Sequence, residues 1–354
     1  MYYEIVNEKI TYDEKNPIHF LKWNFINTSK LKNFKERIQS SKQYEIPLNG
    51  NTNSNLDITN FSGIIKEDEL QEFVSNLIPY SFILQVKIEL KSPYFSRDDD
   101  NFYLIQNPCL KEKVFKVPMI KGSGWKGAIA SAFRKIINES DNKKETIRSF
   151  MRIFGTGSNE FRELQKNIEK SLKENTNLEP DKLITYVLFE LGLKLTKDDI
   201  DKIKTNPEEW IRENLWESFE KGSKKELPLY LTTHRGRAIF YPTYFNRLSL
   251  EIINPHDRKK RAGTNPIHYE VVPEETEGIL QIVYVPFDGV LMKNDDLEAQ
   301  IKNDIDFLVQ SIEKAKDMGI GAKTKLGWGR FELITKKIKC NKNDITIPKG
   351  WSDE

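Results

Sequence analysis

Residues 319–331 read Gly-Ile-Gly-Ala-Lys-Thr-Lys-Leu-Gly-Trp-Gly-Arg-Phe and connect two regular segments. Residues 295–318 before them carry apolar side chains at helical spacing, and residues 330–335 after them are typical of a strand. Gly319 is placed to end the helix, because glycine readily adopts the positive φ of a C-terminal cap. Three further glycines leave room for a second stretch of backbone: Gly321, Gly327 and Gly329. The stretch therefore predicts a tight loop between the last helix and the last strand.

A second glycine-rich stretch precedes the other core helix. Residues 118–127 read Pro-Met-Ile-Lys-Gly-Ser-Gly-Trp-Lys-Gly, and the helix is predicted over residues 128–138, with Ser123 as its N-cap. The remaining strands are predicted at residues 81–90, 237–242 and 279–287. The resulting order, strand–helix–strand–strand–helix–strand, is the split βαβ arrangement, which RRM domains use to present a sheet to single-stranded RNA.

These elements predict an α+β fold with a ferredoxin-like (RRM-like) core that is interrupted once. The core is predicted at residues 80–142 and 227–340, on either side of a helical insertion at residues 143–226. Residues 1–79 are polar and are interpreted as an N-terminal extension, and residues 341–354 as a C-terminal tail.

Composition narrows the function classes. No apolar run approaches the length of a membrane span, and the N-terminus lacks the layout of a signal peptide, so a cytoplasmic protein without membrane contact is expected. Two isolated cysteines, Cys109 and Cys340, and four scattered histidines argue against a disulfide framework or a metal site, and no cofactor is expected. With 55 basic and 53 acidic residues, the net charge does not indicate a nucleic-acid binder. Evidence for nucleic-acid binding therefore has to come from local clusters of basic residues.

Basic residues are concentrated in the glycine-rich stretches. Lysines within a glycine loop are suited to hold a phosphate chain, and a helix start favours a phosphate through its backbone N–H groups. The candidate RNA contacts in the two stretches are Lys121, Ser123, Trp125, Lys126, Lys323, Lys325, Trp328 and Arg330. The alternatives are a turn with solvated lysines and an ordinary capped helix in which Trp125 belongs to the core.

A third basic stretch lies in a loop between Pro255 and Gly263. Its candidate RNA contacts are His256, Arg258, Lys259, Lys260 and Arg261. Charge runs are usually a solvated face, but a basic loop within an RNA-binding fold is suited to contact phosphates.

Four of these stretches together resemble the RAMP superfamily of CRISPR-associated RNA-binding proteins. Residues 319–331 are similar to its C-terminal glycine-rich loop, and residues 118–129 resemble its Pro-x-Ile-Pro-Gly-Ser-Ser-Leu-Lys-Gly-Ala-Leu-Arg segment, with Lys121 where proline is usual. Residues 151–155 resemble its Leu-Phe-Gly motif, and residues 234–240 its Lys-Gly-x-Leu-x-Phe strand, which adds Arg235 and Arg237 to the candidate contacts. The motifs occur in the family's order and span about residues 81–336.

Within the superfamily, Ile-Asn-Pro-His at residues 253–256 and Asn-Pro-Ile at residues 265–267 resemble the sixth RAMP subunit of the type III-B (Cmr) effector complex. This resemblance implies an RNA-binding structural subunit of a type III CRISPR complex that serves antiviral defence. It implies contacts with guide RNA, target RNA and neighbouring RAMP subunits.

An enzymatic alternative is left open by three consecutive carboxylates, Asp98, Asp99 and Asp100. In the backbone subunits of type III complexes, an aspartate in the loop between the first strand and first helix supports cleavage of target RNA, and these residues occupy the corresponding loop, residues 96–101. Such carboxylates would orient the 2′-OH or hold a divalent metal such as Mg²⁺. The structural alternative is a solvent-exposed acidic turn.

Overall fold

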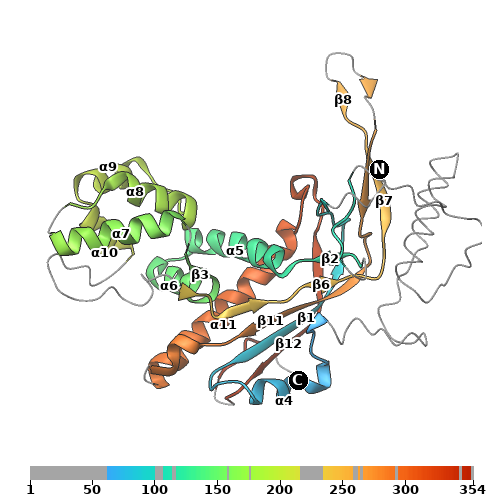
Figure 1. Ribbon diagram of the computed structural model, residues 1–354, viewed down its shortest axis with the longest axis horizontal. Helices are drawn as coiled ribbons and strands as arrows, with labels where there is room; N and C mark the ends of the chain where they lie inside the picture. Colours follow the sequence, from blue (N-terminus) through green and yellow to red (C-terminus); the bar gives the residue numbers. More distant parts are fainter. Residues whose placement is uncertain are drawn as a thin grey trace, which may run out of the picture.

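The computed structural model describes residues 62–99, 107–113, 117–157, 159–174, 177–215, 234–257, 262–263, 266–291, 294–342 and 345–351. Its centre is an antiparallel sheet with the strand order β12-β1-β11-β5 (Figure 1). The four strands are β1 (Phe82–Leu90), β5 (Ala238–Phe240), β11 (Glu277–Tyr284) and β12 (Phe331–Cys340). Phe82 faces Tyr284 on one side and Cys340 on the other, so β1 lies in the middle of the sheet with its register fixed on both edges.

Two long helices cover one face of this sheet: α5 (Gly122–Glu139) and α11 (Asn294–Met318) (Figure 1). Alternate residues of β1, from Phe82 to Leu90, join the helices in the main hydrophobic core. Each helix connects two strands of the sheet in the sequence order β1-α5-β5-β11-α11-β12. This order confirms the predicted α+β class and the split βαβ arrangement.

The opposite face of the sheet is covered by the chain's own residues 62–75. A 3₁₀ turn (Glu67–Glu69) leads into α4 (Leu70–Ser75), whose Leu70 and Val74 pack on the sheet with Ile83 and Val283. The side chains of Gln85 and Gln281 hold the backbone ahead of this turn: Gln281 accepts from Ile65 N at 2.8 Å and donates to Gly63 O at 2.9 Å. The sheet surface with which an RRM binds RNA is thus partly occupied by protein.

Most of the described residues between 143 and 215 are helical. They form α6 (Lys143–Phe154), α7 (Asn159–Glu174), α8 (Pro180–Thr185), a π-helical turn (Tyr186–Glu190), α9 (Lys197–Thr205) and α10 (Pro207–Asn214). α6 packs on α5 and α11, whereas α7 to α10 lie together at the far end of the molecule from the sheet (Figure 1). The short strand β3 (Gly155–Thr156) after α6 pairs with β4 (His234–Arg235), which brings the chain back to the core.

A two-stranded ribbon that the sequence did not indicate projects beyond the sheet (Figure 1). β7 (Ser249–Ile253) pairs with β10 (Ile267–Val271), and β8 (His256–Asp257) pairs with β9 (Ala262–Gly263) farther along it. At its base, β2 (Met119–Ile120) pairs with β6 (Thr243–Tyr244). Within the described residues, no helix has both the length and the apolar character needed to cross a membrane.

Candidate nucleic-acid interface

The glycine loop after α11 is fixed to the segment that follows β1. Ala322 N donates to Phe95 O at 2.7 Å, Gly329 N donates to Pro93 O at 2.9 Å, and Arg330 N donates to Ser92 Oγ at 2.8 Å. These bonds satisfy backbone groups on the inner side of the loop. These bonds hold the backbone of the loop in a defined conformation.

Two of the loop glycines have the predicted role of admitting a second backbone. A Cβ on Gly329 would lie 1.9 Å from Ile320 O, and one on Gly321 would lie 2.4 Å from Phe95 O. Gly319 has φ +78° and ends α11, as expected of a C-terminal cap. Gly327 differs, because its φ is +86° but a Cβ there would meet only Arg330 Cζ at 4.0 Å. Gly327 thus serves the backbone conformation of the loop, and its Cα faces open space.

The basic side chains of the loop lie on its outer side. Lys323, Lys325 and Arg330 are all exposed, and the Nζ of Lys323 lies 5.2 Å from the centroid of the Tyr269 ring. Trp328 is half-buried and packs edge-to-face with Tyr269, at 5.7 Å between ring centroids. The loop therefore presents cations to solvent, while its tryptophan belongs to a small aromatic cluster at the base of the ribbon.

The start of α5 also faces solvent. Ser123, Gly124, Lys126 and Gly127 are exposed; a Cβ on Gly127 would meet nothing within 4 Å, and one on Gly124 only Ile120 at 3.5 Å. Glycine inside a helix costs about 1 kcal/mol relative to alanine, and packing in this fold does not require it at these two positions. Desolvation lowers the pKa of Lys126 below its ordinary value. The first two turns of α5 thus offer a bare backbone surface beside a lysine.

The prediction that Ser123 caps α5 is wrong. The N-cap is Lys121, no side chain forms a cap hydrogen bond, and the helix begins at Gly122. A Cβ at Gly122 would lie 2.1 Å from Phe240 O, so the early start depends on close packing against the end of β5. The helix also begins six residues before the predicted residue 128, so that Ser123, Trp125 and Lys126 lie within its first two turns.

The two glycine-rich stretches rest on the same part of the core. Trp125 is fully buried, donates from Nε1 to Thr243 Oγ1 at 2.8 Å, and packs edge-to-face on Phe331, 5.4 Å between centroids. Phe331 directly follows the glycine loop, and Tyr94, which contacts Gly321, donates from its hydroxyl to Met119 O at 3.3 Å. The prediction that Trp125 contacts RNA is therefore wrong, because its ring has no exposed face on which a base could stack.

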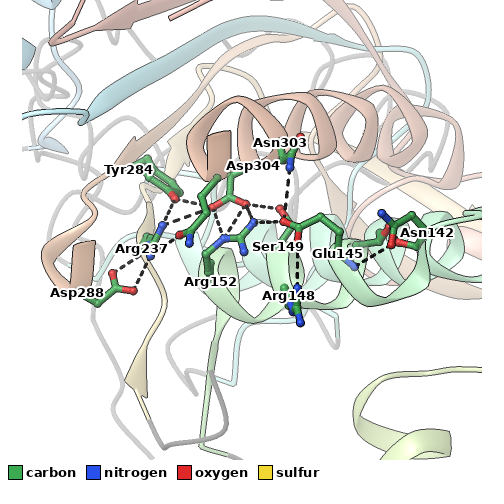
Figure 2. Close-up of polar contacts among 12 residues, drawn as sticks. Asn142, Glu145, Arg148, Ser149, Arg152, Arg237, Tyr284, Asp288, Asn303 and Asp304 are labelled. Atoms are coloured by element: carbon green, nitrogen blue, oxygen red, sulfur yellow. Dashed lines mark hydrogen bonds and ion pairs between the residues drawn. The ribbon is translucent and has the colours of Figure 1, made fainter. Parts of the chain in front are cut away.

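Arg237 is also a core residue, so its predicted RNA contact is wrong. Its side chain is 2% exposed and makes a bidentate ion pair with Asp288, at 2.7 and 2.6 Å (Figure 2). It also donates to the hydroxyl of Tyr284 at 3.0 Å. All its strong donors are engaged inside the protein, and the neighbouring motif residue Arg235 is the exposed one.

The tyrosine extends this network to a second arginine. Tyr284 donates to Asp304 Oδ2 at 2.5 Å, and Asp304, which is fully buried on α11, accepts from Arg152 of α6 at 2.6 Å (Figure 2). Ser149 donates to the same carboxylate. Burial and the adjacent Asp304 carboxylate raise the pKa of Tyr284 well above its ordinary value, so the hydroxyl keeps its proton. Sequence reasoning missed this cluster, because Asp304 lies in the apolar pattern of α11 without any motif around it.

The loop that carries the three aspartates, called the aspartate loop below, is attached through Asp98 to the base of the ribbon. Asp98 is half-buried and accepts from Lys111 N at 3.2 Å, and Lys111 itself forms a buried ion pair with Glu270 of β10. The Asp99 side chain is 95% exposed, with one carboxylate oxygen 3.9 Å from Arg97 Nε. Among the residues that the structure describes, no three His, Cys, Asp or Glu side chains are grouped to hold a metal ion. Asp98 therefore has a structural role that Asp99 lacks.

Several predicted contacts lie outside the described residues. These are Asp100, Arg258, Lys259, Lys260 and Arg261, together with the side chain of His256, whose backbone is in β8. Of the described candidate RNA contacts, Trp125 and Arg237 are buried, Trp328 is half-buried and the rest are exposed. The exposed set is Lys121, Ser123, Lys126, Arg235, Lys323, Lys325 and Arg330.

The comparison with family models agrees with the sequence motifs. The model of the RAMP superfamily matches residues 87–332. A chain in a cryo-EM structure of the type III-B Cmr-beta complex bound to cognate target RNA is similar with 13% identity and a TM-score of 0.46, over 94% of this chain and 80% of that one. The crystal structure of Cmr6 from Pyrococcus furiosus is similar with 15% identity and a TM-score of 0.29, over 72% of this chain and 99% of that one. No curated protein matches the sequence.

Proposed function

The chain belongs to the RAMP superfamily, and from that membership we propose that it is an RNA-binding structural subunit of a type III CRISPR effector complex. In this role it contacts the guide RNA and its paired target RNA and packs against neighbouring RAMP subunits. The resemblance of residues 253–256 and 265–267 to the sixth RAMP subunit supports the assignment to type III-B complexes.

The observation that carries this proposal is the pair of exposed glycine-rich surfaces. The start of α5 offers the exposed Gly124 and Gly127, with open space above Gly127, and the loop after α11 offers Lys323 and Lys325 on a fixed backbone. Bare backbone lets a sugar–phosphate chain approach closely, and the adjacent cations neutralise its charge.

The covered outer face of the sheet restricts the RNA path. Residues 62–75 occupy the surface over Ile83 and Val283, so an RRM-like mode, with bases stacked on the central strands, would require this segment to leave. We therefore place the RNA on the glycine-rich side, toward the base of the ribbon. The exposed Arg235 on β4 is a further candidate contact on the insertion side.

Ultraviolet cross-linking of the assembled, RNA-bound complex, followed by peptide mass spectrometry, tests this placement. We expect cross-linked peptides from residues 119–127 and 319–330, and none from residues 62–75. Cross-links confined to residues 62–75 and the outer strands would show an RRM-like mode and refute the proposed surface. A complex from which no RNA co-purifies would refute the function itself.

The enzymatic alternative, a backbone-type subunit that cleaves target RNA, rests on the aspartate loop. Its supporting observation is the exposed carboxylate of Asp99 beside the ribbon. Replacing the aspartates with alanine in the assembled complex distinguishes this enzymatic alternative from the structural function.

A further inference from the structure

Three aromatic side chains join the glycine loop, the base of the ribbon and the segment after β1. Phe95, Tyr269 of β10 and Trp328 pack edge-to-face on one another, with ring centroids 5.0 Å apart for Phe95 and Tyr269, 5.7 Å for Tyr269 and Trp328, and 6.3 Å for Phe95 and Trp328. Together with Val271 they belong to a hydrophobic cluster that is separate from the main core. This aromatic cluster holds the glycine loop against the ribbon.

The exposed Lys323 contacts this cluster through its ammonium group. Its Nζ lies 5.2 Å from the centroid of the Tyr269 ring, which is within the range of a cation–π contact. Tyr269 is buried, and its ring is held in place by Phe95 and Trp328. An aromatic ring attracts an ammonium without neutralising its charge, whereas a carboxylate would neutralise it. The contact therefore orients the ammonium of Lys323 and leaves it able to bind an anion.

The backbone at Lys323 is fixed in a conformation that is unusual for lysine. Lys323 has φ +65°, whereas the other positions of the loop with positive φ are all glycines: Gly319, Gly321, Gly327 and Gly329. Its carbonyl oxygen accepts from Leu326 N at 2.8 Å, at the start of a 3₁₀ turn (Thr324–Leu326). The left-handed conformation favours glycine, because a Cβ is strained there. The backbone therefore does not explain a lysine at this position, and the contact of its side chain with Tyr269 supplies a reason for it.

We propose that Tyr269 is a positioning residue for RNA binding, whose ring holds the Lys323 ammonium in the orientation that meets a phosphate of the bound RNA. This rests on the proposed RNA-binding function and adds to it a residue of the ribbon that acts through the glycine loop. A free lysine side chain loses rotamer freedom when it binds, and one that is already oriented loses less. Removing the ring should therefore weaken RNA binding only while Lys323 is present.

A double-mutant cycle on the RNA affinity of the assembled complex tests this dependence. Lys323→Ala should reduce the magnitude of the slope of log K against log salt by about 0.7, as expected for one lost phosphate contact with single-stranded RNA. Tyr269→Leu should weaken RNA binding about 2- to 5-fold when Lys323 is present, which is the size of one cation–π contact at an exposed site. In the Lys323→Ala background, Tyr269→Leu should have no further effect.

Further variants separate the charge distribution of the ring from its packing. Tyr269→Phe keeps the aromatic face and should bind RNA as the wild type does. Fluorinated phenylalanines at position 269 keep the shape of that ring but withdraw charge from its face, so RNA binding should weaken with each added fluorine. Val271→Ala is the control for packing, because it shortens a fully buried side chain of the same cluster. It should change RNA affinity equally with and without Lys323.

The possible results distinguish the positioning role from the proposed function. Equal losses from Tyr269→Leu with and without Lys323 would give the ring a purely structural role and overturn the positioning role alone. Tighter RNA binding without the ring, or an affinity that stays constant across the fluorinated series, would overturn it too. Lys323→Ala with the affinity and slope of the wild type would instead show that this lysine does not contact RNA, which would contradict the proposed RNA surface as well.

Discussion

The glycine loop and the buried network around Asp304 put the same kind of residue to opposite uses. Lys323 and Arg237 are both basic residues close to glycines in motifs of the family, yet Lys323 is exposed and the Arg237 side chain is 2% exposed. The loop presents cations to a partner, whereas the network neutralises its cations with Asp288 and Asp304 inside the protein. A basic residue in a family motif therefore cannot be assigned as an RNA contact from the motif alone. It can instead be paired with carboxylates inside the protein.

The largest effect that this difference predicts is on stability. Asp304→Ala leaves Arg152 and Tyr284 without their shared acceptor in the core, and we expect a loss of about 3–5 kcal/mol in the free energy of unfolding. Urea denaturation measures it. The matched control is Asp306→Ala, two residues along the same helix on an exposed position, which should change stability by less than about 0.5 kcal/mol. Equal effects of the two substitutions would mean that the network does not stabilise the fold.

Within the loop, two glycines with similar φ separate backbone packing from backbone conformation. Gly327→Ala adds a methyl group in open space at φ +86° and should cost about 1–2 kcal/mol from conformation alone. Gly329→Ala also forces a Cβ to within 1.9 Å of Ile320 O, so its cost should exceed that of Gly327→Ala. Thermal unfolding and RNA affinity of both variants provide the measurement, and a Gly327→Ala variant that is the more damaged of the two would contradict the loop geometry.

Much of the fold follows from local sequence patterns. The predicted strand at residues 81–90 and helix at residues 295–318 each differ from β1 and α11 by one residue at one end, because both have clear periodicity. The last strand extends to Cys340, five residues beyond the prediction, since Lys336, Lys337 and Lys339 obscure its apolar alternation. The ribbon of β7 and β10 was missed for a related reason: its residues show no strict alternation, and pairing across the intervening loop defines it.

The site was less predictable, because its features depend on distant contacts. Ser123 satisfies every local rule for an N-cap, but the approach of Phe240 O to Gly122 moves the helix start. Trp125 lies in a motif of exposed residues, and its burial depends on distant contacts such as its hydrogen bond to Thr243, 118 positions away. The lysines of both glycine-rich stretches are exposed, while the partners of Arg237 and Arg152 could not be read from spacing.

The two cysteines, Cys109 and Cys340, are buried like Arg237, and a smaller effect on stability is expected from them. Burial raises the pKa of Cys109 and of Cys340 to about 12, so both thiols stay protonated at neutral pH. Native protein should therefore react with iodoacetamide far more slowly than urea-unfolded protein, as followed by mass spectrometry. Because each folded-state pKa is raised above its unfolded value, the unfolded chain loses these protons first, and the thiols' contribution to stability falls as the pH rises above about 8.5. Rapid modification of the native protein at neutral pH would contradict their burial.

No effect on chemistry is expected at the aspartate loop. Replacing Asp98, Asp99 and Asp100 with alanine in the assembled complex should leave target-RNA cleavage unchanged at every site, with a modest loss of stability because Asp98 accepts from Lys111 N. Asp99→Asn alone keeps that bond and isolates the exposed carboxylate. Loss of one cleavage site in both variants would replace the structural role by the enzymatic alternative.

The central claim is that the glycine loop contacts RNA through Lys323, Lys325 and Arg330, and the salt dependence of RNA affinity tests it most directly. In a triple alanine variant of the assembled complex, the slope of log K against log salt should decrease in magnitude by about 2, because each contact with single-stranded RNA contributes about 0.7. The control replaces three exposed lysines of α9, Lys197, Lys202 and Lys204, and should leave the slope unchanged. A triple variant with the affinity and slope of the wild type would contradict the claim.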